Sequence, residues 1–199
     1  MPGRPRIASD EEIFAAVGDA LSDTGPAGLT LAAVAGRCGL TASALTYRFG
    51  SKQELFLAFA RDAATSVTRP FERARRTAAN GAVESLHQAL AELVRPVSRH
   101  EALAHHLAML HLDVADPDLR AHAAEHQRRF HGCVEALLAD AVDRGELRAD
   151  TDPVALAHTV GAVYHGTLVI WAVDGDGDLV SRIRTAVDRA LHPYRAERA

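Results

Sequence analysis

The sequence predicts an all-α protein of about nine helices. Hydrophobic residues make up 48% of its 199 residues and aromatic residues only 5%, while alanine is abundant. Alanine has the highest helix propensity of all residues. No stretch alternates apolar and polar residues as a half-buried strand would, and no repeat of fixed period occurs. The length permits one domain or two small ones, with a sizeable core.

The first predicted helix begins at a capping box. In Ser9-Asp-Glu-Glu12 the serine side chain can accept from the backbone N–H of Glu12, whose side chain can reach back. Apolar residues then recur at helical spacing, at Ile13, Phe14, Val17 and Leu21. The GPAG stretch at 25–28 is expected to end this helix.

Residues 31–49 fit the requirements of a helix-turn-helix. A short helix over 31–38, capped by Thr30, is broken at Gly39, and a further helix runs from Thr41 to near Gly50. Ala35 is small where the two helices cross, and Gly39 supplies the positive φ of the turn. Apolar side chains that can hold the pair together are Val34, Cys38, Leu40 and Leu45.

The rest of the chain predicts a larger helical domain. A second capping box, Ser51-Lys-Gln-Glu54, opens a long fourth helix, which Pro70 should kink or end. Five further helices are predicted over 82–94, 101–114, 117–144, 153–173 and 179–191, two of them after Asp-Pro caps. We therefore expect a small N-terminal helix-turn-helix domain over 1–50 and a larger helical domain over 51–199.

One segment is long enough to span a membrane. Residues 154–173 contain no Asp, Glu, Lys or Arg. They do contain polar His and Thr residues, and their flanks are acidic, so a helix buried between the core and a partner subunit is favoured. The two cysteines form no disulfide framework, and the N-terminal residues lack a signal-peptide apolar region. We expect a cytoplasmic protein without a membrane anchor.

The run from about Ile7 to Leu57 resembles the N-terminal domain of TetR (tetracycline repressor-type) regulators. The resemblance rests on TGPAGLTLAAVA followed by GLTASALTYRFGSKQEL, in which Tyr47, Phe49, Ser51 and Lys52 match the family's aromatic pair and Ser-Lys. It covers about a quarter of the chain, and the remainder matches the family in helix pattern alone. It implies a homodimeric transcriptional regulator, more often a repressor, that a small-molecule effector releases from a double-stranded DNA operator. By the same resemblance, residues 1–50 are the DNA-binding domain and residues 51–199 the effector-binding and dimerisation domain.

The resemblance also implies which residues contact DNA. The groove-facing positions are Thr41, Ala42, Ser43, Ala44 and Thr46, and the phosphate contacts are Thr30, Tyr47 and Lys52, with Arg48 on a phosphate or a base edge. Family members often have glycine at the position of Ser43 and tyrosine at that of Thr46. Without the second tyrosine, Tyr47 must reach the phosphates alone.

Charge placement explains how a chain of net charge −4 could bind DNA. The five acidic residues between Asp10 and Asp23 belong to the first helix. Outside it, residues 1–55 carry Arg4, Arg6, Arg37, Arg48 and Lys52 against Glu54 alone. The basic arm with Arg4 and Arg6 could enter the adjacent minor groove. The helix from Thr41 to near Gly50 is called the reading helix here, and its small side chains let its backbone approach the major groove closely.

Effector candidates come from several helices of the C-terminal half. Tyr164, Leu168 and Trp171 recur at helical spacing on the apolar segment, although such stripes are ordinarily core. By resemblance, Phe59, Met109, Leu110 and Phe130 surround an effector cavity, with His106, His165 and Tyr164 as polar groups. The resemblance also pairs helices 153–173 and 179–191 with their copies in a four-helix dimer interface.

The alternative is a metal-binding or enzymatic bundle that uses the histidines between His100 and His131. His122-Ala-Ala-Glu-His126 spells an inverted zinc-protease motif, but no acidic ligand follows in a recognisable context. DGDGD at 174–178 resembles the start of a calcium loop, yet Leu179 and Thr185 replace its required Gly and Glu. A third possibility is a dimeric ligand sensor that acts through a protein partner. We expect no catalytic residue, metal or cofactor.

Overall fold

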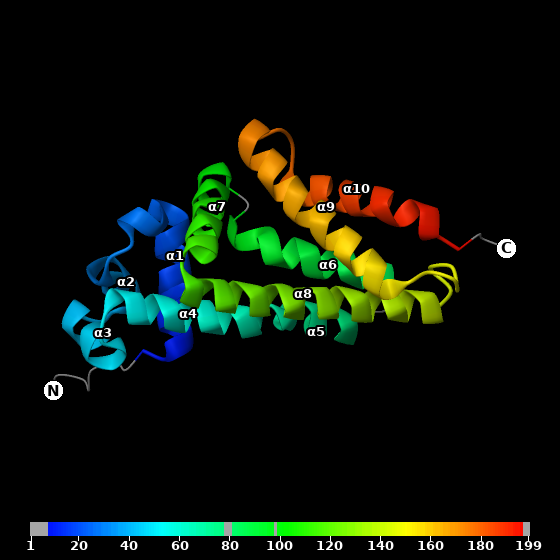
Figure 1. The fold of residues 1–199 in the computed structure, drawn as a ribbon. Coiled ribbons are helices and arrows are strands. Elements are labelled where there is room, and N and C mark those ends of the chain that lie inside the picture. The colour runs from blue at the N-terminus through cyan, green and yellow to red at the C-terminus, as the bar shows by residue number, and fades with distance from the viewer. Residues whose placement is uncertain (1–7, 78–80, 98, 197–199) are drawn as a thin grey trace. The chain divides into compact units, whose positions relative to one another are not determined.

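The computed structural model describes residues 8–77, 81–97 and 99–196, and within them every regular element is helical. Ten α-helices are present (Figure 1), which confirms the all-α prediction. They are α1 Asp10–Gly28, α2 Leu31–Cys38, α3 Ala42–Phe49, α4 Lys52–Ser66, α5 Thr68–Arg76, α6 Ala82–Val94, α7 His100–Ala115, α8 Pro117–Asp143, α9 Pro153–Asp174 and α10 Leu179–Leu191.

Local signals set the boundaries of the first three helices as predicted. The backbone N–H of Glu12 donates to Ser9 Oγ at 3.2 Å, and that of Ser9 donates to Glu12 Oε2 at 2.9 Å. α1 is broken at Gly25, where φ is 66° and ψ 180°, so the GPAG stretch interrupts the helix as expected. Gly39 ends α2 with φ 70°.

The predicted fourth helix is divided into α4 and α5. A proline has no N–H to donate, and its ring clashes with the carbonyl of residue i−4. For Pro70 that residue is Ser66, which is the last residue of α4. The interruption therefore lies one turn before the proline, and it accounts for the tenth helix.

The chain forms two compact units. The first joins the chain up to Ala63 with Glu101–Ala123, and the second joins Ala64–His100 with Ala124–Ala199. The first unit is therefore built around α1 to α3 but also includes most of α7. The predicted functional boundary near residue 50 is a separate matter and stays a prediction.

The core of the first unit pins the helix-turn-helix as expected. Val34, Ala35 and Leu45 are buried, and Cys38 and Leu40 pack against the same cluster. Ile13 and Val17 of α1 complete it. One face of α3 is thus fixed through Leu45, and its opposite face is left outside the core.

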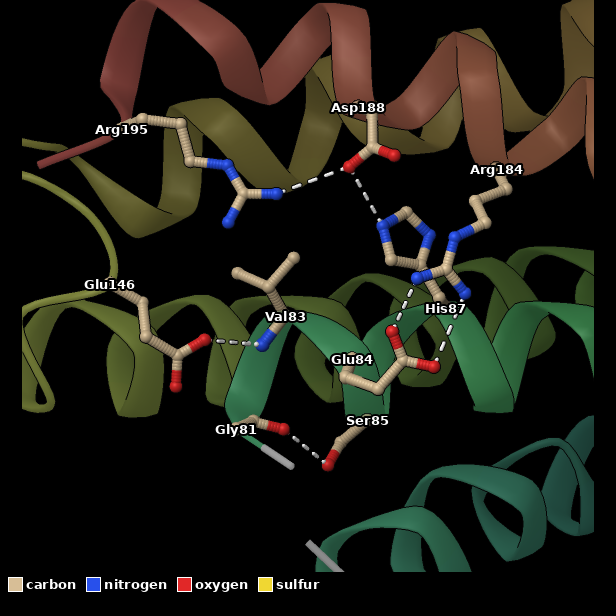
Figure 2. Close-up of polar contacts among 9 residues, drawn as sticks. All are labelled: Gly81, Val83, Glu84, Ser85, His87, Glu146, Arg184, Asp188 and Arg195. Carbon is tan, nitrogen blue, oxygen red and sulfur yellow. Dashed lines mark hydrogen bonds and ion pairs between the residues drawn. The ribbon is translucent and has the colours of Figure 1, made fainter. Parts of the chain in front are cut away.

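In the second unit, a loop residue caps α6 (Figure 2). The Glu146 carboxylate accepts from the backbone N–H groups of Ala82 at 2.7 Å and Val83 at 2.9 Å. Gly81 has φ 100°, and a Cβ there would lie 2.9 Å from Glu146 Oε1. The glycine therefore permits both the turn and the close approach of the carboxylate.

Polar contacts also tie α6 to α10 (Figure 2). His87 Nε2 lies 3.0 Å from Asp188 Oδ1, and Arg184 forms an ion pair with Glu84. His87 is only 5% exposed, and burial lowers its pKa despite the neighbouring Asp188 carboxylate. These contacts anchor α10, which lies beside α9 (Figure 1).

Among the described residues, α9 is the one helix long and apolar enough to cross a membrane. The 18-residue stretch that meets this criterion has a mean hydropathy of 1.3, and 44% of it is buried. The core helix of a soluble protein can be equally long and apolar. Asp152 caps the helix, accepting from the N–H groups of Val154 and Ala155, as the Asp-Pro signal predicted.

Candidate nucleic-acid interface

The outer face of α3 presents short polar side chains. Thr41 caps the helix, since its Oγ1 accepts from the N–H of Ala44 at 3.1 Å. Ser43, Ala44 and Thr46 are exposed, and Ala42 is half-buried. Thr46 Oγ1 donates to the carbonyl of Ala42 at 3.0 Å, within the helix. A backbone covered by such small groups can approach a groove closely.

Tyr47 extends from the end of α3 with 95% of its surface exposed. A large aromatic side chain left this exposed gains nothing from the core of its own chain. Its hydroxyl is available to a phosphate, which is the role the resemblance implies.

The helices before and after α3 in the sequence, α2 and α4, each begin with a capping side chain. Thr30 Oγ1 accepts from the N–H of Ala33 at 3.1 Å, and Ser51 Oγ accepts from that of Glu54 at 3.1 Å. Lys52 is exposed in the first turn of α4. A cation at this end is repelled by the positive end of the helix dipole. A phosphate would be attracted both by that dipole and by the charge of Lys52.

The basic residues of this region were expected to lie apart from the acidic residues of α1, but two arginines pair with those acidic residues. Arg48 donates to the carbonyl of Ala8 at 2.6 Å and pairs with Asp10 at 2.8 Å. Arg37 pairs with Asp23 at 3.0 Å. The acidic residues of α1 therefore neutralise two of the basic residues, and only the acidity of α1 itself hinted at this. Arg4 and Arg6 lie outside the described residues.

The effector candidates divide between the two units. In the first unit, Phe59 lies among Phe14 and Phe56, with ring centroids 6.5 and 6.3 Å away. Met109 packs against the same core. His106 is exposed, and so is Leu110. Phe59 and Met109 thus contribute to the core beneath the helix-turn-helix.

In the second unit, the structure brings Phe130, Tyr164 and His165 together. The ring centroid of Phe130 lies 5.4 Å from those of both Tyr164 and His165. Tyr164 is buried, and burial raises the pKa of its hydroxyl. Leu168 and Trp171 are also buried, and Trp171 Nε1–H donates to the carbonyl of Gly177 at 3.0 Å. These residues are packed as core.

Two hollows lie elsewhere in the second unit, and none of the nine predicted effector residues lines either. One, of about 310 Å³, runs between α5 and α8 beside Phe71, Arg75, Arg129 and Cys133. The other, of about 100 Å³, lies between α6 and α10 beside His87 and Arg184. No sequence motif marked these residues, because the hollows arise from how distant helices pack.

The stretches at 122–126 and 174–178, which resemble a zinc-protease motif and a calcium loop, have local structural roles. Within the described part of the chain, no group of three or more His, Cys, Asp or Glu side chains could hold a metal. Glu125, inside the zinc-protease-like motif, pairs with Arg128 and Arg129. The DGDGD stretch is a turn between helices, in which Asp178 caps α10 and Asp174 pairs with Arg182.

Two family models match the chain in succession. Residues 13–59 match "Bacterial regulatory proteins, tetR family", and residues 106–187 match "Tetracyclin repressor-like, C-terminal domain". The chain belongs to the TetR family. The resemblance noted for residues 7–57 is confirmed and extends to the C-terminal half. This TetR-family chain is a DNA-binding transcriptional regulator, and the enzymatic or metal-binding alternative gains no support.

Individual relatives span nearly the whole TetR-family chain. The HTH-type transcriptional repressor AcnR of Corynebacterium diphtheriae is 29% identical over 182 residues, covering 91% of this chain and 90% of that protein. A TetR transcription regulator from Haloarcula marismortui has a TM-score of 0.74 at 17% identity, covering 94% and 97% of the two chains. SmeT, the repressor of a Stenotrophomonas maltophilia multidrug efflux pump, has a TM-score of 0.68 at 23% identity, covering 96% and 92%. The structural neighbours establish the fold.

Proposed function

We propose that the chain is a homodimeric repressor that binds a near-palindromic operator through α3 and leaves it when a small molecule binds. The outer face of α3 carries this proposal. Leu45 anchors the helix in the core, while Ser43, Thr46 and the 95% exposed Tyr47 face outward. The relatives named AcnR are repressors, which supports repression here. FadR of Bacillus subtilis is solved in complex with stearoyl-CoA, which supports an effector site in this fold.

Four apolar side chains on α9 support the homodimer. Val154, Val169, Ile170 and Val173 are between 46% and 83% exposed. Val169, Ile170 and Val173 lie close together near the end of α9. Exposed apolar surface of this kind marks interaction surfaces, because burying it against a partner removes apolar area from water. A second copy of α9 and α10 is the partner we propose, in the cytoplasm where a DNA-binding regulator acts.

The proposed DNA contacts divide into two kinds. Ser43, Ala44 and Thr46 read base edges from the groove, and Tyr47, Thr30 and Lys52 hold phosphates. Arg48 reaches DNA only by leaving Asp10 or by sharing its guanidinium with a phosphate. The effector occupies the second unit, for which the hollow between α5 and α8 is a stronger candidate than the packed cluster around Tyr164.

Selection of the full-length protein against randomised duplex DNA tests this function. A dimer with two reading helices should enrich one near-palindrome, with half-sites about one helical turn apart. Selection at low salt favours even weak phosphate contacts. If no sequence is enriched under those conditions, the chain is not an operator-binding repressor.

A further inference from the structure

α7 belongs to the unit that contains the reading helix, although it lies far from that helix in the sequence. The first unit takes in Glu101–Ala123, whereas the residues on either side of this segment belong to the second unit. The chain enters this segment from the second unit at His100 and returns to it after Ala123, within α8. Whatever holds α7 to α1 therefore acts within the unit that contains the reading helix.

α1 offers α7 an incomplete hydrogen-bond acceptor. In a regular helix the carbonyl of Ser22 would accept from the N–H of residue 26. That residue is Pro26, which has no N–H, and the helix is already broken at Gly25. A buried or half-buried carbonyl that lacks its helical donor needs another donor.

His105 of α7 supplies this donor. Its Nδ1 lies 2.9 Å from the carbonyl oxygen of Ser22. A carbonyl can only accept, so the proton of this hydrogen bond is on Nδ1. A Cβ on Gly25 would lie 2.9 Å from Cδ2 of the same ring, so the glycine leaves the space that His105 occupies. One turn further along α7, Met109 packs against the core of the unit.

We propose that His105 is a positioning residue. It docks α7 on the Ser22 carbonyl that Pro26 leaves without a donor, and this fixes the spacing of the two reading helices in the dimer. The inference rests on the proposed function, since spacing has meaning only for a dimer on a two-half operator. In the proposed dimer, α9 and α10 of the second unit form the interface, so a loosely held α7 would leave each reading helix freer to shift.

The test uses three forms of the operator obtained by selection. The spacer between their half-sites has the selected length, one base pair less or one base pair more. Wild-type protein should prefer the selected spacing, and His105→Ala should lower that preference by about threefold to tenfold, as expected for one lost hydrogen bond. His105→Asn should restore it, because its Nδ2–H₂ takes the place of Nδ1–H. His105→Gln, whose donor reaches further, should not. His111→Ala, an exposed histidine on the same helix, is the matched control.

A merely structural role would give a different pattern. Loss of stability weakens binding to all three operators equally and leaves their ratio unchanged. An unchanged ratio in His105→Ala therefore overturns the inference while the repressor function stands. If wild-type protein enriches no operator at all, the proposed function fails and this inference fails with it.

A double-mutant cycle tests the dock without DNA. Gly25→Ala strains a residue at φ 66° and also brings a Cβ against the His105 ring. In the His105→Ala background only the strain remains, so Gly25→Ala should lower the melting temperature less there than in wild type. Equal losses in both backgrounds would show that the His105 ring does not occupy this space, and would contradict the proposed contact between His105 and the Ser22 carbonyl.

Discussion

Arg48 and Lys52 lie four residues apart but are held in opposite ways. Arg48 is fixed by the carbonyl of Ala8 and by Asp10, so it stabilises the start of α1. Lys52 is exposed and forms no ion pair with any described residue. Capping residues could be recognised in the sequence because their partners are three residues away. The partners of Arg48 lie about forty residues away, so spacing alone could not identify them.

Lys52→Ala should weaken binding to all operator sequences evenly. One lost phosphate contact lowers the slope of log K against log salt by about 0.9. Fluorescence anisotropy with the selected operator between 50 and 200 mM salt measures this slope. Ser43→Ala is the matched comparison, since it should relax one base preference and leave the slope unchanged. A slope unaltered by Lys52→Ala would remove the lysine from the phosphate contacts.

The helices themselves were largely predictable, because caps, glycines and prolines act locally. α2, α6 and α10 have the predicted limits, and the break before α5 follows from Pro70. Side chains that complete a helix from elsewhere were not predictable. Glu146 caps α6 from more than sixty residues downstream, and nothing in the sequence near Gly81 indicates it.

Glu146→Gln should destabilise the second unit. The neutral amide offers one acceptor oxygen in place of two, and it loses the attraction of a carboxylate to the helix N-terminus. A loss of about 1 kcal/mol is expected, which lowers the melting temperature of a chain of this length by about 2–4 °C. Calorimetry at fixed protein concentration measures this loss, and Glu72→Gln, at an exposed residue of α5, is the control. Equal melting temperatures for the two variants would argue against the cap.

At the scale of the whole molecule, the sequence predicted the helical class and the family but not which helices share a unit. The sequence predicts one set of effector residues, but Phe59 and Met109 belong to the unit of the reading helix, and Tyr164 and Trp171 belong to the other unit. Each of these four side chains packs into a core. Which core each one joins depends on long-range packing that periodicity does not encode.

Ile170→Glu should convert the dimer to monomer. Ile170 is 56% exposed on α9, and a carboxylate there would be buried without a partner in the proposed interface. Sedimentation velocity measures the change. Val114→Glu, at a residue 60% exposed on α7, should leave the dimer intact. A dimer that persists in Ile170→Glu would place the interface elsewhere.

The discontinuous first unit also affects how the protein is made. A nascent chain that has emerged only as far as Ala63 contains α3 but lacks the α7 residues that complete the unit. The carbonyl of Ser22 then waits for a donor that is translated some eighty residues later. The ribosome must therefore have delivered well over half of the polypeptide before the part that reads DNA reaches its finished form. A chimera that contains residues 1–63 alone would likewise lack the His105 donor to the Ser22 carbonyl.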